Sequence, residues 1–209
     1  MTEPTPVPWA SVERRGPALF LSAGVLLVVA AVYYAVPLLL ENVELSSWLG
    51  LTVLLGRLIT LLGIAGLTVR LVNRSSRAVK VARVVVAVAV ALTGGLLVSA
   101  VLENLGVGVP IIAVFGLGTI VLSIVTYGLV GVLILRTGAH APVIGGLLLA
   151  ATGGLLFGFF GQAVLPENVV GAVTESVLAV TSLAIGYRLR IGVESTPPSD
   201  AVSETSPHR

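Results

Sequence analysis

The sequence predicts an all-α fold, a polytopic membrane helical bundle of six transmembrane helices. Of the 209 residues, 56% are hydrophobic and only 11% are charged, and the mean hydropathy is +1.07. A water-soluble exterior would need many more charged side chains. Six runs with almost no charge are each about as long as the ~20 residues that cross the hydrocarbon layer of a bilayer. They lack the period-two alternation of barrel strands, so their backbone groups must be satisfied within helices.

The first expected helix covers residues 17–40. It follows Arg14 and Arg15, a context that also precedes some cleaved signal peptides. With 24 residues it exceeds the roughly 7 to 15 residues of a signal core, so we expect it to be retained as a span. The other expected helices cover 45–69, 84–102, 110–135, 142–165 and 169–187.

Three regions follow from these spans. We expect a cytoplasmic N-terminal segment at 1–16, a six-helix transmembrane domain at 17–190 and a disordered cytoplasmic tail at 191–209. From Glu194 onward the tail is rich in Ser, Pro and acidic residues and has too little apolar surface to fold.

Basic residues are sorted between the two sides of the predicted bundle. Ten Lys and Arg flank the two ends or lie in the second-to-third and fourth-to-fifth connections, whereas the other three connections have none. Because cytoplasmic loops retain positive charge during insertion, we expect both termini in the cytoplasm of a multi-pass protein of the cell membrane. The ten residues are Arg14, Arg15, Arg70, Arg74, Arg77, Lys80, Arg83, Arg136, Arg188 and Arg190.

The second-to-third connection is the most basic of all. Each Lys or Arg near a membrane surface gains about 1 kcal/mol from anionic lipid, so this connection is expected to bind anionic lipid headgroups. It has no interleaved aromatic residues, which argues against a nucleic-acid partner. The basic residues concerned are Arg70, Arg74, Arg77, Lys80 and Arg83.

A Glu-Asn pair recurs at each of the three acidic turns, as Glu41-Asn42, Glu103-Asn104 and Glu167-Asn168. Asn closes and caps helices, and Glu complements the dipole at a helix N-terminus, so turn chemistry explains the recurrence. The similar spacing between the three Glu residues is also consistent with three tandem helical hairpins. However, the TGGLL segments at 93–97 and 152–156 are out of register with that spacing. A further alternative is an external ring of the three carboxylates that attracts cations.

Arg57 and Glu175 are ionisable residues inside expected spans. A central Arg costs about 2.5 to 3.5 kcal/mol to insert, which the many Leu residues around it offset. Counted from the starts of their runs, the two residues differ in depth by roughly 9 Å, which leaves direct contact open. One hypothesis is a structural ion pair between the second and sixth helices. The other is a solute, anion or proton site with Glu175 as counter-charge.

Small and polar residues form stripes at helical spacing in the fourth, fifth and sixth helices, where they favour close helix packing. If the stripes surround a gap instead, seven residues are predicted to line a polar site. They are Arg57, Thr60, Ser123, Thr126, Gln162, Glu175 and Ser182.

Catalytic and cofactor signatures are absent from the sequence. There is no Cys, and the two His residues, His140 and His208, fall in a connection and in the tail, so no catalytic residue, metal site or cofactor is expected. We therefore expect no enzyme.

Two function classes remain. The first is transport of a small solute or ion through the polar seam near Arg57 and Glu175. The second is a non-catalytic accessory or scaffold subunit of a membrane complex, with a membrane-protein partner or a second copy of the chain. Transport predicts a water-accessible cavity that reaches Arg57, whereas a scaffold predicts a dry centre and an apolar groove on the lipid side.

Overall fold

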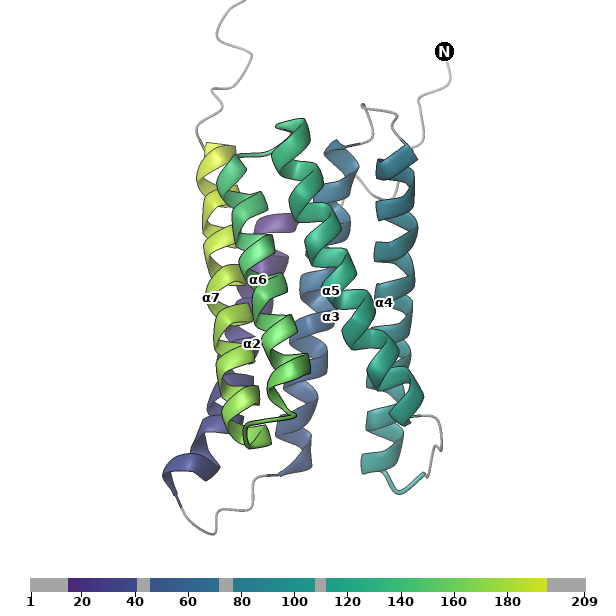
Figure 1. Cartoon of the computed structure of the whole chain (residues 1–209), viewed down its shortest axis with the longest axis vertical. Coiled ribbons are helices and arrows are strands. Elements are labelled where there is room, and N and C mark those ends of the chain that lie inside the picture. The colour runs from purple at the N-terminus through teal and green to yellow at the C-terminus, as the bar shows by residue number, and fades with distance from the viewer. Residues whose placement is uncertain (1–14, 41–45, 72–76, 108–111, 195–209) are drawn as a thin grey trace, which may run out of the picture.

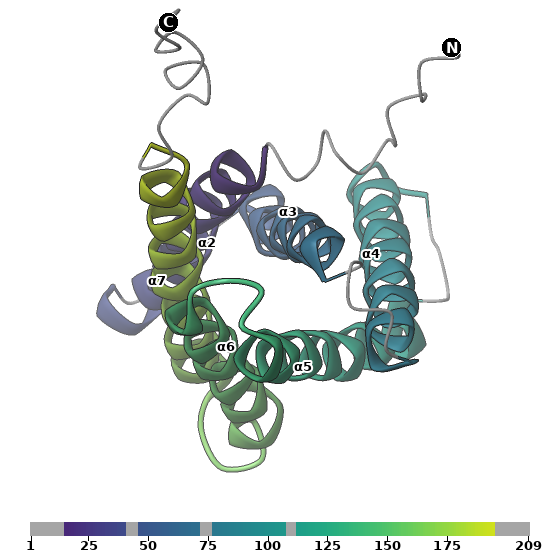
Figure 2. The same ribbon diagram turned by 90° about the horizontal axis from the view of Figure 1, so that it is seen from above.

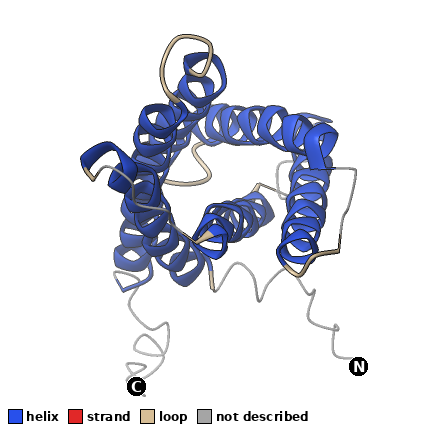
Figure 3. Ribbon diagram, turned by 90° about the horizontal axis from the view of Figure 1, so that it is seen from below, coloured by secondary structure: helices blue, strands red, loops and turns tan. Residues whose placement is uncertain are grey.

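The computed structural model describes residues 15–40, 46–71, 77–107 and 112–194. These ranges form six helices and contain no strand (Figures 1 and 3). All six are long and apolar enough to cross a membrane, which confirms the predicted fold class. The helices are α2 (Gly16–Leu39), α3 (Ser47–Arg70), α4 (Arg77–Asn104), α5 (Ile112–Thr137), α6 (Pro142–Gly161) and α7 (Glu167–Glu194).

Helix ends differ from the expected spans where charges flank the apolar runs. Helix α4 begins at Arg77, seven residues before the expected 84, and α7 covers 167–194 where 169–187 was expected. Charges mark the edge of the hydrocarbon layer, but backbone hydrogen bonds continue a helix beyond that edge. Helix α6 ends at Gly161 because the chain turns there, with the amides of Val164 and Leu165 donating to the Gly161 carbonyl.

The helices alternate in direction, so α2 begins and α7 ends at the same end of the bundle (Figure 1). We call this the terminal end. The opposite end, which carries Glu103 and Glu167, is called the acidic end. Seen along the bundle, each helix packs against its neighbours in the chain, and α7 returns to pack against α2 (Figure 2). The result is a closed ring of six helices.

Glycines permit the close approach of α2 to its two neighbours. A Cβ on Gly24 would lie 2.5 Å from the Leu183 side chain of α7, and one on Gly63 of α3 would lie 2.9 Å from the Phe20 ring. Helices α5 and α6 also meet at glycines, since a Cβ on Gly145 would lie 2.9 Å from the Gly131 carbonyl. These glycines lie outside the small-residue stripes predicted in the fourth to sixth helices. Within those stripes, a Cβ on Gly154 would lie 2.8 Å from Val177 and one on Gly186 2.8 Å from Leu21, which confirms close packing there, whereas one on Gly146 would meet no atom within 4 Å.

Two of the Glu-Asn pairs, Glu103-Asn104 and Glu167-Asn168, lie within the described residues. Glu167 occupies the first turn of α7, where a carboxylate complements the helix dipole, as expected. The Asn104 side chain donates to the Ala100 carbonyl at 2.8 Å, but the left-handed residue that closes this turn is Gly106, with φ +82°, rather than Asn104. The pair Glu41-Asn42 lies outside the described residues, so the carboxylate ring stays a prediction.

The predicted hairpins are adjacent pairs in the ring. However, α3 with α4 and α5 with α6 are neighbours in the same way, so packing does not set three hairpins apart. Tandem repetition stays a prediction.

Candidate functional site

Arg57 of α3 and Glu175 of α7 form an ion pair, with the guanidinium Nη2 donating to the carboxylate Oε1. The helices begin at Ser47 and Glu167, so the residues lie ten and eight positions from the acidic end, a difference of about 3 Å in depth. The larger gap expected from the apolar runs came from taking their edges as the helix starts. The pair joins two helices that are separated in the ring by α2.

The two partners differ in exposure. The Arg57 side chain is 19% exposed, whereas the Glu175 side chain is 1% exposed. Arg57 Nε and Glu175 Oε2 have no hydrogen-bond partner among the described residues. A buried donor or acceptor without a partner costs free energy, so this pair retains unused capacity to bind a water or a polar solute.

A cavity of about 270 Å³ lies above the ion pair in the acidic half of the bundle. It extends from Gly50, Gly116 and Gln162 near the acidic end to Arg57 and Glu175 at its floor. All six helices contribute to its wall, α2 through Tyr34 and α4 through Leu96. A cavity of this size has room for a solute of a few non-hydrogen atoms.

Tyr34 separates this cavity from a second one of about 340 Å³ at the acidic end, because Tyr34 and Gly50 line both. The second cavity is also lined by Glu167 and Asn168, so the third acidic turn borders the route to the ion pair. Tyr34 is held tightly, since a Cβ on Gly171 of α7 would lie 2.5 Å from its ring.

The terminal half below the ion pair is closed. Leu61, Ile64, Val130, Ile134 and Ile185 are all fully buried there and belong to one apolar cluster. The floor of the cavity therefore lies against a packed apolar cluster.

His140 contributes to the closure of the terminal end. It lies between α5 and α6, and its Nε2 atom is 3.1 Å from the Leu67 carbonyl of α3. That carbonyl belongs to the last turn of α3, where helix carbonyls lack an intrahelical partner, so the imidazole binds α3 to the opposite side of the ring.

Of the seven predicted site residues, the structure brings Arg57, Gln162 and Glu175 to the cavity wall. The other four are buried among the helices and do not line it. Thr60 donates to the Gly56 carbonyl at 2.8 Å, and Thr126 has no hydrogen-bond partner among the described residues. Ser123 and Ser182 are the other two predicted residues that are buried away from the cavity.

Sequence reasoning missed three polar residues of the cavity wall, Tyr34, Thr119 and Thr174. Thr119 lies in the polar stripe of the fourth span, and Thr174 directly precedes Glu175. The sequence positions of both residues could therefore have indicated that they line the site. Tyr34 gave no such indication, because an aromatic residue near the end of a span is equally typical of the interface belt.

The charge of the cavity wall is balanced, with one cation and one anion. No three metal-ligating side chains gather anywhere in the described ranges. The wall can bind a solute through hydrogen bonds and charge, and it presents no nucleophile activated by a neighbouring base. No protein-family model, curated protein or solved structure matches this chain.

Proposed function

We propose that this protein transports a small polar solute or ion, which it binds in the cavity above the Arg57–Glu175 pair. The observation that supports the proposal is the cavity itself, because it is lined by all six helices and ends at an intramembrane ion pair. Charged residues at membrane depth are costly and commonly mark transport pathways. We propose the orientation that the distribution of Lys and Arg predicts, with both termini in the cytoplasm and the acidic end on the outer side of the cell membrane.

The difference in exposure within the ion pair suggests what the solute presents. Both residues line the cavity, but the Arg57 side chain is 19% exposed and the Glu175 side chain 1%, so Arg57 offers more surface to a solute. We therefore propose a solute with an oxygen acceptor, such as a small carboxylate, whose binding competes with Glu175 for Arg57.

A cavity that ends at a packed apolar cluster fits a carrier better than an open channel. A carrier exposes its midplane site to one side at a time, while the other side is sealed by packed helices. The buried apolar cluster around Ile64 and Ile134 would be that seal, and transport would require it to open.

An accessory subunit is the second candidate, because apolar grooves lie on the lipid side of the ring. One of them, between α2 and α7, is lined by small residues such as Ala31, Ala35 and Ala172, which permit close approach of another helix. In that case the partner is a membrane protein or a second copy of the chain.

Accessibility of single cysteines distinguishes the two candidates, since the natural chain has no Cys. Ile120→Cys lines the cavity, whereas Ser123→Cys on the same helix is buried away from it and Val121→Cys is exposed toward lipid. In proteoliposomes treated with a charged thiol reagent, we expect Ile120→Cys to react and the other two to stay protected. Acetate at high concentration should slow that reaction if the solute is a small carboxylate.

Equal protection of all three cysteines would contradict a water-filled cavity and leave the accessory role. Labelling of Ile120→Cys that acetate, chloride and sodium all leave unchanged would support access to water but contradict binding of a small carboxylate or of these ions.

A further inference from the structure

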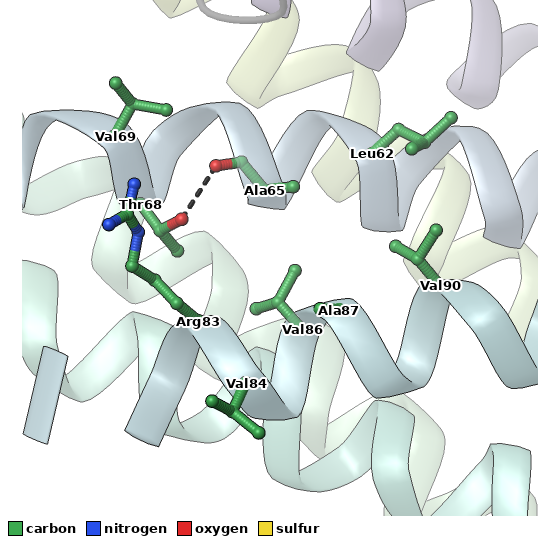
Figure 4. A pocket seen from close by; sticks show the side chains of 9 residues that line it. All are labelled: Leu62, Ala65, Thr68, Val69, Arg83, Val84, Val86, Ala87 and Val90. Carbon is green, nitrogen blue, oxygen red and sulfur yellow. Dashed lines mark hydrogen bonds between the residues drawn. The ribbon is translucent and has the colours of Figure 1, made fainter. Parts of the chain in front are cut away.

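Another cavity lies between the terminal halves of α3 and α4. It is a groove of about 530 Å³ that shares no lining residue with the central cavity. Figure 4 shows its two walls: Thr68 of α3 and Arg83, Val86 and Val90 of α4 point into the space between the helices, whereas Val69 and Val84 point away from it. The lining residues are Leu62, Ala65, Thr68, Val69, Arg83, Val84, Val86, Ala87 and Val90.

Only one lining side chain is charged. Arg83 extends from α4 toward Thr68 and Val69 of α3, at the end of the groove nearer the terminal end (Figure 4). Arg83 has no ion-pair partner among the described residues. A half-buried guanidinium without a described counter-charge favours binding of an anion.

The rest of the groove is suited to bind a hydrocarbon chain. The Thr68 hydroxyl already donates to the Ala65 carbonyl at 2.7 Å, and every other lining residue except Arg83 is apolar. From Arg83 to Val90 the groove runs about 10 Å along the helix axis. Both walls belong to helices able to span the membrane, so the groove faces the acyl region of a bilayer.

We propose that this groove binds one anionic phospholipid, with an acyl chain between α3 and α4 and the phosphate on Arg83. The guanidinium offers paired N–H donors that match phosphate oxygens, and its position at the basic end places it near the headgroups. The exposed cation Lys80, on the first turn of α4, adds positive charge at the same end. The site is a defined groove with one lipid, in contrast to a diffuse attraction along the basic connection.

Lipid retention on the purified full chain tests this proposal. The protein is exchanged into detergent containing equal phosphatidylglycerol and phosphatidylcholine, and bound lipid is counted by native mass spectrometry. We expect one retained phosphatidylglycerol, preferred over phosphatidylcholine about fivefold or more. Arg83→Gln should remove that preference, and Ala87→Phe, which fills the groove from an exposed position, should remove the lipid itself.

Two matched variants control for charge and for bulk. Arg77→Gln removes an exposed cation from the same end of α4, and Ala91→Phe adds a ring one turn further along α4, at an exposed position outside the groove. Both should retain phosphatidylglycerol as the natural chain does. If Ala87→Phe fails to fold, the comparison of Arg83→Gln with Arg77→Gln decides alone.

Three results would overturn the proposal. The first is an equal loss of preference in Arg83→Gln and Arg77→Gln, which would indicate diffuse attraction. The second is displacement of the retained lipid by inorganic phosphate alone, which would show that the acyl chain contributes nothing. The third is a dimer that Ala87→Phe dissociates, which would assign the groove to a second copy of the chain.

Discussion

The two halves of the bundle differ in how they are packed. In the terminal half, large aliphatic side chains such as Leu61 and Ile134 fill the centre of the ring. In the acidic half, Gly50, Gly116 and Gly158 line a cavity instead, and the Arg57–Glu175 ion pair is its floor. A membrane bundle gains little from burying apolar groups, so packing and polar contacts decide where it is closed and where it is open.

The largest expected effect comes from the ion pair at the boundary between the halves. Glu175→Leu leaves the Arg57 guanidinium without its counter-charge in a mostly buried position. We expect the free energy of unfolding to fall by about 3 kcal/mol, at the lower end for a broken buried pair because part of Arg57 faces the cavity. Reversible unfolding in mixed micelles measures the loss.

The double variant Arg57→Leu/Glu175→Leu is the control for this prediction. It removes both charges, so its stability should return to within about 1 kcal/mol of the natural chain. A double variant as unstable as Glu175→Leu would show that the loss comes from altered packing and has no electrostatic cause.

A pair of matched truncations compares the packing of the two halves directly. Ile134→Ala opens a hole in the closed half and should cost about 2 to 3 kcal/mol. Ile120→Ala enlarges a space that already exists and should cost less than about 1 kcal/mol. Thermal unfolding of both variants in the same detergent provides the measurement. Equal losses would show that the acidic half is packed as densely as the terminal half.

Glycine substitutions also compare the packing of the bundle, but they add a methyl group where the truncations remove side-chain atoms. Gly145→Ala places a Cβ 2.9 Å from the Gly131 carbonyl, so α5 and α6 must separate and we expect a cost of about 1 to 2 kcal/mol. Gly116→Ala meets no atom within 4 Å and should stabilise α5 by up to about 1 kcal/mol. Unfolding midpoints that shift in the same direction for both variants would contradict the contrast.

The smallest expected effect concerns the predicted polar seam below the ion pair. Thr126 is fully buried and its hydroxyl has no partner among the described residues, so Thr126→Val should raise stability by less than about 1 kcal/mol. Labelling of Ile120→Cys should be unchanged in this background. A marked loss of stability, or of labelling at Ile120→Cys, would indicate that Thr126 belongs to the functional site.

Sequence reasoning identified the charged floor of the site more successfully than its wall. Arg57 and Glu175 stood out because ionisable residues are costly in lipid and need a partner. Thr60, Ser123, Thr126 and Ser182 were grouped with them by helical spacing, yet a Thr or Ser can satisfy its hydroxyl on its own helix, as Thr60 does with the Gly56 carbonyl. Spacing alone cannot distinguish a hydroxyl that lines a cavity from one that packs between helices.

The amino-acid sequence by itself determined the class of this protein, because length and hydropathy decide which segments cross a bilayer whatever their neighbours are. It also singled out the two intramembrane charges. Only the tertiary structure decided that α7 closes the ring against α2, that the charges meet, and that one half is hollow and the other closed. These properties depend on which faces of distant helices come together, and no local periodicity of a single helix specifies its partner.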